Sequence, residues 1–187
     1  MARALGLLLV AALLAGCGGS SKHAFPALDP AKTYDVALQT NYGSFTIRLA
    51  VKTSPNATGS FVSLAKKGFF DGTKFHRIIP GFVIQGGDPT GTGTGGPGYT
   101  TVDPVPASTR YVHGVAAMAK TGSQPAGTAG SQFFVVTARD AGLTPDYAVL
   151  GQVTGGLGVV DRIGRLGDAG GQPTALVELE RATVTER

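Results

Sequence analysis

The sequence predicts a mostly β fold, in which a closed eight-stranded antiparallel β-barrel is capped by two α-helices. Three observations favour this fold class. About eight segments have the alternation of strands, two have helical spacing, and the connections between them are short. Strands and helices do not alternate along the chain, which disfavours a doubly wound parallel sheet. The length of 187 residues, with 15% charged residues, fits one compact domain with a substantial core.

The predicted strands follow from apolar alternation and from turn residues. Two alternating segments flank the turn Asn41-Tyr42-Gly43 and indicate an opening hairpin. The stretch from Phe75 to Pro89 is predicted to form two strands hinged at Pro80-Gly81. In full, the predicted strands are residues 34–41, 43–50, the two halves of 75–89, 112–120, 131–138, 147–153 and 175–184.

Two helices are predicted from capping residues and apolar spacing. The first begins at Ser54-Pro55 and ends at Gly68, because proline suits the first helical position and glycine the end. The second lies within residues 156–167. Their apolar sides are formed by Phe61, Leu64 and Ala65 in the first helix and by Val159, Val160, Ile163 and Leu166 in the second.

The first residues have the pattern of an export signal. Arg3 precedes an apolar run from Leu5 to Ala15, which is too short to span a bilayer comfortably and fits a signal-peptide core. The run ends in Leu14-Ala15-Gly16-Cys17, which resembles the lipobox of bacterial lipoproteins. That resemblance implies that Cys17, the one cysteine, carries fatty acyl chains such as palmitate. The alternative is a plain secretory signal with a coincidental cysteine.

We therefore expect three parts in the chain. Residues 1–16 form a lipoprotein signal peptide, residues 17–33 the lipidated cysteine and a flexible tether, and residues 34–187 one folded domain. Because two acyl chains anchor a protein stably, the expected location is extracytoplasmic, on a bacterial membrane. An acylated Cys17 leaves no thiol for a disulfide or for a cysteine nucleophile.

Motifs of several other functions lack the context that they need. Gly91–Gly96 matches G-x-G-x-x-G, but no helical segment follows, so nucleotide binding is disfavoured and a flexible loop is expected. Residues 114–121 miss a phosphate-binding loop by one glycine. No Lys/Arg cluster exceeds two adjacent residues despite a formal charge of +4, which argues against nucleic acid. The histidines lack metal-ligand spacing and no G-x-S-x-G occurs, so we expect no metal, no cofactor and no serine hydrolase.

Three sequence blocks carry a family resemblance. The first contains FHR at 75–77, PGF at 80–82, QGGD at 85–88 and GG at 95–96. The second contains GVAAMA at 114–119 and GSQFFVVTA at 130–138, and the third is LTPDYAVLGQV at 143–153. In order and spacing they resemble the cyclophilins, which are peptidyl-prolyl cis-trans isomerases, over roughly residues 34 to 185. The resemblance implies a barrel with two helices and activity on X–Pro bonds.

The resemblance also implies roles for individual residues. Arg77 falls at the position of the catalytic arginine, with Phe82 and Gln85 beside it in the catalytic set. The implied substrate-binding residues are His76, Met118, Ala119, Lys120, Gln132, Phe134, Leu143 and Tyr147. Of these, Met118, Phe134 and Leu143 would line a proline pocket together with Phe82, while Ala119 and Lys120 would act through their main chain.

The chemistry of X–Pro rotation explains why such residues are needed. Rotation breaks amide resonance, against a barrier of about 18–20 kcal/mol, and the twisted proline nitrogen regains a lone pair. A donor aimed at that nitrogen stabilises the transition state and not the planar ground state. An arginine suits this role, because its guanidinium is rigid and always charged. This accounts for Arg77 and Gln85 within otherwise apolar strands.

The chain departs from the family at two positions. Gly142 stands where many members have a tryptophan that contacts cyclosporin, so weak cyclosporin binding is expected. Lys120 stands where many members have asparagine, and a changed substrate preference is expected there.

The predicted protein is thus a monomeric isomerase of Pro-containing exported polypeptides. The alternatives are a non-catalytic chaperone or scaffold that binds Pro-containing segments, and a surface adhesin or virulence factor that kept the fold.

Overall fold

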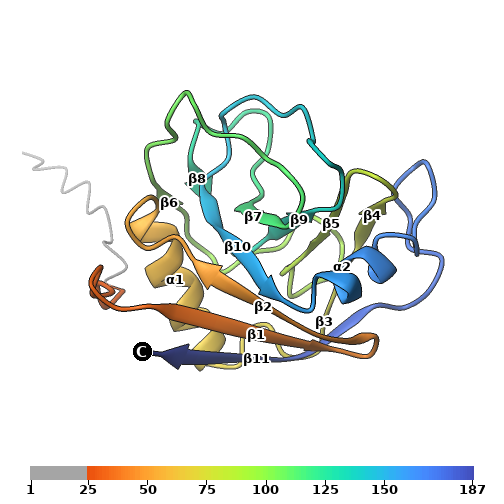
Figure 1. The fold of residues 1–187 in the computed structure, drawn as a ribbon, viewed down its shortest axis with the longest axis horizontal. Helices are drawn as coiled ribbons and strands as arrows, with labels where there is room; N and C mark the ends of the chain where they lie inside the picture. The colour runs from red at the N-terminus through yellow and green to blue at the C-terminus, as the bar shows by residue number, and fades with distance from the viewer. Residues whose placement is uncertain (1–24) are drawn as a thin grey trace, which may run out of the picture.

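The computed structural model of the protein describes residues 25–187 (Figure 1). The described chain folds into a curved β-sheet with two helices packed against it (Figure 1). In chain order the elements are β1 (Tyr34–Thr40), β2 (Gly43–Leu49), α1 (Pro55–Lys66), β3 (Thr73–Lys74), β4 (Arg77–Ile79), β5 (Val83–Gly86), β6 (Thr101–Val102), β7 (Val115–Met118), β8 (Thr128–Ala129), β9 (Phe133–Val136), β10 (Val149–Gly155), α2 (Leu157–Ile163) and β11 (Glu178–Glu186).

Most strands belong to a single antiparallel sheet. Its nine strands have the order β3-β11-β1-β2-β10-β7-β9-β5-β4, and β6 pairs with β8 in a separate two-stranded sheet. Figure 1 shows α1 and α2 near opposite ends of the long β1–β2 hairpin. The predicted mostly β class with two helices is confirmed. The predicted closed eight-stranded barrel is wrong, because the sheet is an open half-barrel with β3 and β4 at its edges.

Short edge strands and a covering loop keep the sheet open. β3 has two residues and β4 has three. The N–H of Ile78 in β4 donates to the carbonyl oxygen of Gly171, 3.0 Å away in the loop between α2 and β11. At Gly167 of the same loop, a Cβ would lie only 2.0 Å from the carbonyl oxygen of Ile78. Because this loop contacts the N–H and the carbonyl group of Ile78, the outer edge of β4 does not pair with β3.

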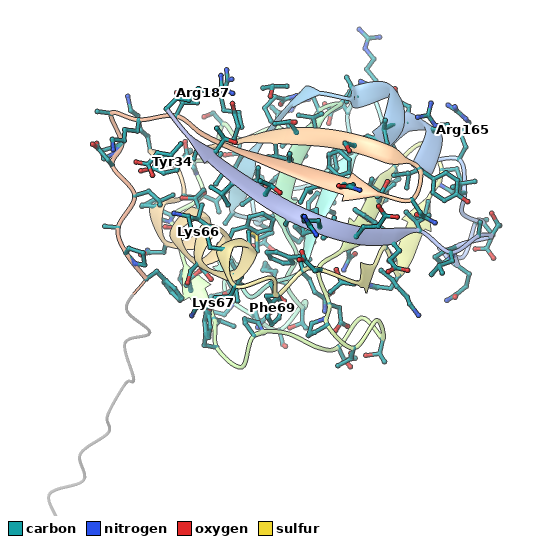
Figure 2. All side chains as sticks on the ribbon, turned by 90° about the horizontal axis from the view of Figure 1, so that it is seen from below. Tyr34, Lys66, Lys67, Phe69, Arg165 and Arg187 are labelled. Carbon is teal, nitrogen blue, oxygen red and sulfur yellow. The ribbon has the colours of Figure 1, made fainter. Side chains whose placement is uncertain are left out.

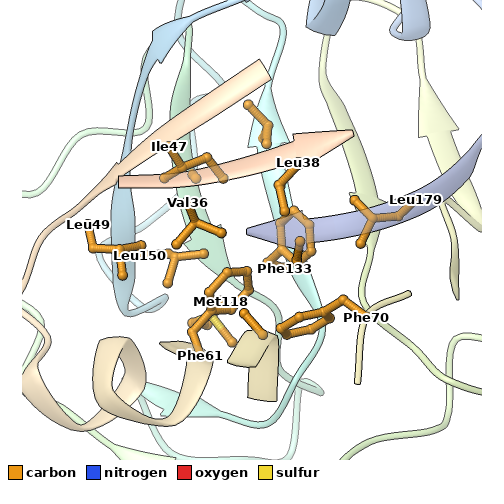
Figure 3. Packing of buried hydrophobic residues seen from close by; sticks show 14 of the residues in the cluster. Val36, Leu38, Ile47, Leu49, Phe61, Phe70, Met118, Phe133, Leu150 and Leu179 are labelled. Atoms are coloured by element: carbon orange, nitrogen blue, oxygen red, sulfur yellow. The ribbon is translucent and has the colours of Figure 1, made fainter. Parts of the chain in front are cut away.

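The main core packs between the sheet and the helices (Figure 3). Val36 and Leu38 alternate on the inner face of β1 and are fully buried. Phe61 of α1 contacts Phe70 with ring centroids 4.5 Å apart and meets Phe133 of β9 edge-on at 5.4 Å. These aromatic contacts fasten α1 to the centre of the sheet.

Helix α1 is capped by a residue far away in the sequence. Pro55 occupies its first position, as predicted, but the side chain of Ser54 makes no capping hydrogen bond. Instead the buried carboxylate of Asp103 accepts hydrogen bonds from the N–H groups of Asn56, at 3.0 Å, and of Ala57, at 2.7 Å. The helix start is therefore tied to the segment that follows β6.

Residues 25–33 lie against the domain. The rings of Phe25 and Tyr99 are 5.0 Å apart, and Leu28 packs against the main core. The N–H of Thr33 donates to the carbonyl oxygen of Arg187 at 2.8 Å, so the start and the end of the described chain lie side by side. Figure 2 shows this closeness at Tyr34 and Arg187. Residues 25–33 of the predicted tether therefore pack against the folded domain.

The remaining N-terminal predictions lie outside the described residues. They concern the signal peptide at residues 1–16, the lipidation of Cys17 and the tether up to residue 24. Within residues 25–187, no helix is both long and apolar enough to cross a membrane.

Candidate active site

A row of directly opposed residues crosses four neighbouring strands. Arg77 of β4 lies opposite Gln85 of β5, which lies opposite Phe134 of β9, which in turn lies opposite Ala117 of β7. Directly opposed residues project from the same face of a sheet. The strand register therefore places an arginine, a glutamine and a phenylalanine side by side, on the face opposite the main core.

A chain of side-chain hydrogen bonds fixes the polar part of this row. Arg77 Nη1 donates to Gln85 Oε1 at 3.3 Å, and Gln85 Nε2 donates to Gln132 Oε1 at 3.0 Å. Gln132 Nε2 then donates to the carbonyl oxygens of Gly93 and Gly95, each at 2.9 Å. Each amide thus has a defined orientation, because its oxygen accepts and its nitrogen donates.

This series of hydrogen bonds ends at the Gly-rich loop around Gly93 and Gly95. The loop is organised around the carboxylate of Asp88. Its Oδ1 accepts hydrogen bonds from the N–H and the hydroxyl of Thr90, and its Oδ2 accepts from the N–H groups of Gly93 and Gly95. Burial by itself raises the pKa of Asp88, but these bonds outweigh it and lower the pKa to about 2. A Cβ at Gly95 would lie 2.0 Å from the carboxylate, so glycine is required there. The G-x-G-x-x-G pattern of residues 91–96 therefore surrounds the carboxylate of Asp88 and not a phosphate.

A second apolar cluster covers the same face of the sheet. Phe82, in the turn between β4 and β5, lies beside Arg77, with the guanidinium carbon 6.0 Å from the ring centroid. Phe134 is 5% exposed and forms the floor of this second cluster. The buried members of this second cluster are Val83, Tyr111, Val115, Ala117, Phe134 and Val136, and the partly buried members are Phe82, Ala119, Ala138, Ala141, Leu143, Tyr147 and Val149.

Tyr147 is held in this cluster by Tyr111. The Tyr111 hydroxyl donates to the carbonyl oxygen of Tyr147 at 2.7 Å and accepts from its N–H at 2.9 Å. The ring of Tyr147 then meets the ring of Phe134 edge-on, with centroids 5.4 Å apart. Burial raises the pKa of the Tyr111 hydroxyl, which keeps this anchor protonated.

A cavity of about 510 Å³ adjoins the row. Gln85 and Gln132 form the side that it shares with the row, and the Gly-rich loop around Gly95 and Tyr99 forms another side. The segment Ala119, Lys120, Thr121 and Gln124 lines a further side. The cavity thus adjoins the second cluster at Ala119, which belongs to both.

Most of the predicted site residues come together on this face. Arg77, Phe82, Gln85, Gln132, Phe134, Leu143 and Tyr147 all belong to the hydrogen-bonded chain or to the second cluster. Ala119 also belongs to the cluster, although its N–H already donates to the carbonyl oxygen of Gln132 at 2.8 Å.

Met118 is the exception among the predicted pocket residues. Its side chain is 1% exposed and lies in the main core, as Figure 3 shows. The physical reason is the period of two along β7: Ala117 faces Phe134 across the strands, so Met118 must face the opposite side. The expected proline pocket therefore lacks this side chain.

His76 packs beneath the Gly-rich loop. A Cβ at Gly93 would lie 3.5 Å from its ring, and neither ring nitrogen completes a hydrogen bond with a described residue. Burial lowers the pKa of His76, and the nearby carboxylate of Asp88 only partly opposes this. The imidazole is therefore neutral at neutral pH, which does not suit it to hold a charge near the substrate.

Three residues of the site were missed by sequence reasoning. Val83 could have been found, because it lies two residues before Gln85 and must share its face. Tyr111 lies outside any strand, and Asp88 acts through a loop whose path has no periodic signal. In the part of the chain that the structure describes, no group of three or more His, Cys, Asp or Glu residues is arranged to hold a metal ion.

The chain matches a known protein family and several of its members. The family described as cyclophilin type peptidyl-prolyl cis-trans isomerase/CLD matches residues 35–184. A peptidyl-prolyl cis-trans isomerase of Helicobacter pylori is 39% identical over 150 residues, which cover 73% of this chain and 90% of the relative. Peptidyl-prolyl cis-trans isomerase-like 1 of Homo sapiens is 41% identical over 134 residues, covering 70% of this chain and 79% of the relative.

A solved structure shares the fold. The crystal structure of a Cryptosporidium parvum cyclophilin type peptidyl-prolyl cis-trans isomerase superposes with a TM-score of 0.75 at 30% identity, covering 82% of this chain and 98% of that chain. The family match spans the row, the Gly-rich loop and the second cluster alike. The chain therefore belongs to the cyclophilin family and is a cyclophilin-type peptidyl-prolyl cis-trans isomerase.

Proposed function

We propose that this isomerase acts on X–Pro bonds of exported polypeptides outside the cytoplasmic membrane, with Arg77 as its catalytic donor. The observation that carries the assignment of Arg77 is its place at the end of the hydrogen-bonded chain. There its guanidinium is fixed by Gln85 and lies beside Phe82. A charged donor next to an apolar surface is what a rotating prolyl amide requires.

In the proposed mechanism Arg77 recognises the twisted amide. A guanidinium has five N–H donors, and the bond to Gln85 uses one of them, so further donors remain for the proline nitrogen. The hydrogen bond forms only when the nitrogen has regained its lone pair, which is differential binding of the transition state. Because Gln85 holds the guanidinium beforehand, little reorganisation is needed during rotation.

The second cluster provides the surface for the proline ring. Phe82, Phe134, Leu143 and Tyr147 present partly or largely apolar side chains on one face. Holding the ring there while the preceding carbonyl turns restricts motion to the reactive bond. Gln85 keeps one amide N–H for the flanking peptide, since its other N–H donates to Gln132. Main-chain contacts at Ala119 and Lys120 stay a prediction.

The role of Arg77 can be tested by exchange kinetics on a short X–Pro peptide. A soluble chain beginning near Ser20 keeps Phe25 in its contact with Tyr99. Replacing Arg77 by alanine is expected to lower kcat/KM about 100-fold, the scale seen when one transition-state donor is removed. The matched control is Arg165→Ala, because Arg165 is exposed on the surface seen in Figure 2. It should leave kcat/KM unchanged.

Two outcomes would overturn this assignment. Equal loss in both variants would separate Arg77 from the chemistry. A folded wild-type chain that binds the peptide without accelerating exchange would favour the alternative of a Pro-segment-binding chaperone.

The proposed location depends on lipidation of Cys17. Residues 18–24 separate Cys17 from Phe25 and reach at most about 25 Å when extended. An acylated protein would then hold Tyr99, which lines the cavity, close to the membrane surface. We infer that the clients are exported polypeptides near that surface and that one anchored copy is sufficient for activity.

Fractionation of bacteria that express the full chain tests this location. The wild-type protein should be found with membranes and be digested by protease added outside the cytoplasmic membrane. Cys17→Ser should abolish incorporation of labelled palmitate, and a chain beginning at Gly18 behind a plain cleavable export signal should appear in the soluble extracytoplasmic fraction. Membrane retention of that chain without Cys17 would contradict the lipid anchor.

We also propose weak cyclosporin binding. Gly142 has φ +64° and open space around its Cβ position, so no side chain extends the cluster there. Substituting tryptophan would strain the backbone, because L-residues rarely adopt this conformation. Inhibition measured with increasing cyclosporin should therefore need far higher concentrations than for a member with the tryptophan, and tight inhibition would contradict the proposal.

A further inference from the structure

Lys120 carries a buried ammonium group beside the second cluster. Its side chain is 4% exposed, and its Nζ lies 2.6 Å from Asp146 Oδ2. The same Nζ donates to the carbonyl oxygen of Gln124 at 3.1 Å and lies 5.6 Å from the ring centroid of Tyr147. A lysine is rarely buried to this extent unless its charge is paired and hydrogen-bonded. These contacts satisfy that condition.

The contacts of Lys120 join two separate segments. Lys120 and Gln124 belong to the segment that follows β7 and lines the cavity. Asp146 and Tyr147 belong to the segment before β10, which also carries Leu143 of the second cluster. The ion pair therefore connects one wall of the cavity to the outer wall of the cluster.

Tyr147 is the point where this connection meets the cluster. Tyr111 fixes the main chain of Tyr147 through two hydrogen bonds, and Phe134 packs against its ring. The ammonium of Lys120 faces the ring of Tyr147 within the range of a cation–π contact. With Lys120 in place, the Tyr147 ring is held by its main chain, by an aromatic neighbour and by a cation.

We propose that Lys120 is a positioning residue for the proline-binding surface. It acts through the Lys120 brace, which we define as its Nζ contacts with Asp146, the carbonyl of Gln124 and the ring of Tyr147. The brace sets the place of the outer wall, formed by Leu143 and Tyr147, over the floor at Phe134. This inference rests on the proposed role of the second cluster in holding the proline ring.

The brace predicts an effect on affinity and not on charge preference. The carboxylate of Asp146 neutralises the ammonium, so the cavity presents no free cation from this lysine. Lys120 does not touch Arg77 or Gln85 in any described hydrogen bond, so the transition-state donor is unaffected. Loss of the brace should therefore weaken peptide binding and leave the rate of the bound complex almost unchanged.

The test is a double-mutant cycle on the full folded domain. Lys120→Met and Asp146→Asn should each raise KM for a short Ala-Pro peptide about fivefold, with kcat within about twofold, because each removes one partner of the ion pair that holds the buried ammonium of Lys120. The double variant should be no worse than the worse single variant, since both act through one contact. Lys120→Arg should keep KM near the wild-type value, because arginine can pair with the carboxylate of Asp146.

Direct peptide binding and thermal unfolding complete the design. Affinity measured by NMR titration should fall in step with KM, and this readout does not require catalysis. The matched control is Lys52→Met, an exposed lysine that belongs neither to the second cluster nor to the lining of the cavity, which should change neither quantity. Asp146 is 35% exposed at its side chain, so Asp146→Asn keeps the test available if Lys120→Met fails to fold.

Three results would overturn the brace. Additive effects of the two substitutions would show that the residues act independently. A lowered melting temperature with unchanged KM and affinity would make the pair merely structural. A wild-type preference for peptides with Glu over Lys before proline, lost in Lys120→Met, would make Lys120 a charge-reading residue instead. Failure of the wild-type protein to accelerate exchange would contradict the proposed function, while binding would still test the brace.

Discussion

At the scale of single residues, the orientation of Arg77 depends on a carboxylate that does not touch it. Asp88 holds the main chain at Gly93 and Gly95, whose carbonyl oxygens orient Gln132, and Gln132 orients Gln85. Four partly buried hydrogen bonds to one charged group organise a loop that forms no helix or strand.

Asp88→Asn is expected to destabilise the domain in a pH-dependent way. The folded state lowers the pKa of Asp88 to about 2, below the unfolded value. The carboxylate therefore contributes stability that is fully present above about pH 4 and is lost as the pH falls toward about 2. At pH 6 the substitution should cost about 2 kcal/mol in the free energy of unfolding, measured with urea.

Repeating the urea series at lower pH provides the control for this prediction. The difference between the wild-type and Asp88→Asn proteins should shrink between pH 4 and pH 2.5. A difference that stays constant over this range would show that the ionised carboxylate is not the stabilising form.

Sequence reasoning predicted most of the side chains that the structure brings together on this face, but not how they are supported. Arg77, Gln85 and Phe134 could be predicted from the family motifs, and the strand register then places them side by side. Met118 was predicted from its position in the family resemblance, but the alternation of faces along β7 turns its side chain into the main core. The support from Tyr111 could not be predicted, because it depends on how distant loops meet.

At the scale of elements, the start of α1 depends on Asp103. The helix has no acidic residue in its first turn, and the carboxylate of Asp103 takes the place of a local cap. The capped N–H groups belong to Asn56 and Ala57, so the interaction joins the helix to the segment after β6. A cap supplied from so far along the chain is absent from any local sequence pattern.

Replacing Asp103 by alanine should lower the free energy of unfolding by about 2 kcal/mol, the upper range for loss of a cap. The matched control is Ser54→Ala at the predicted cap position. Its hydroxyl is buried without a hydrogen-bond partner, so its removal should be nearly neutral. Urea unfolding of both variants measures the difference, and an equal cost at the two positions would contradict this assignment of the cap.

The strand pattern was predictable where strands are long and not where they are short. The hairpin of β1 and β2 and both helices follow the predicted positions, because apolar periodicity extends over several residues. β3, β6 and β8 have two residues each, too few for any period to appear. The open edge could not be foreseen either, since it depends on the loop between α2 and β11.

At the scale of the whole molecule, the segment before β1 is part of the folded domain. Phe25 rests on Tyr99, whose hydroxyl lies 3.0 Å from that of Ser60 in α1, and Leu28 packs against the main core. Tyr99 also lines the cavity. The N-terminal segment therefore contacts Tyr99, which is part of the wall of the cavity beside the candidate active site.

Phe25→Ala should lower the free energy of unfolding by about 1 kcal/mol through loss of an aromatic contact. It should also shift the NMR resonances of Tyr99 and of the Gly-rich loop. Leu176→Ala is the matched control, because Leu176 is 55% exposed and its truncation should cost little. Unchanged resonances at Tyr99 in the Phe25→Ala protein would contradict the coupling.

The position of β9 in the sheet has a consequence for the unfolded chain. Phe133 and Val135 face the main core, whereas Phe134 and Val136 face the second cluster, so all four residues of this strand are buried. Because both faces of β9 are buried, residues 132–137 contain no charged residue and no proline. Such stretches associate with one another when they are exposed, in the manner of steric zippers. Under the export that we propose, the chain crosses a membrane unfolded and presents this stretch before the fold can cover it. The protein proposed to assist the folding of others thus has its own need for rapid folding or for protection against aggregation.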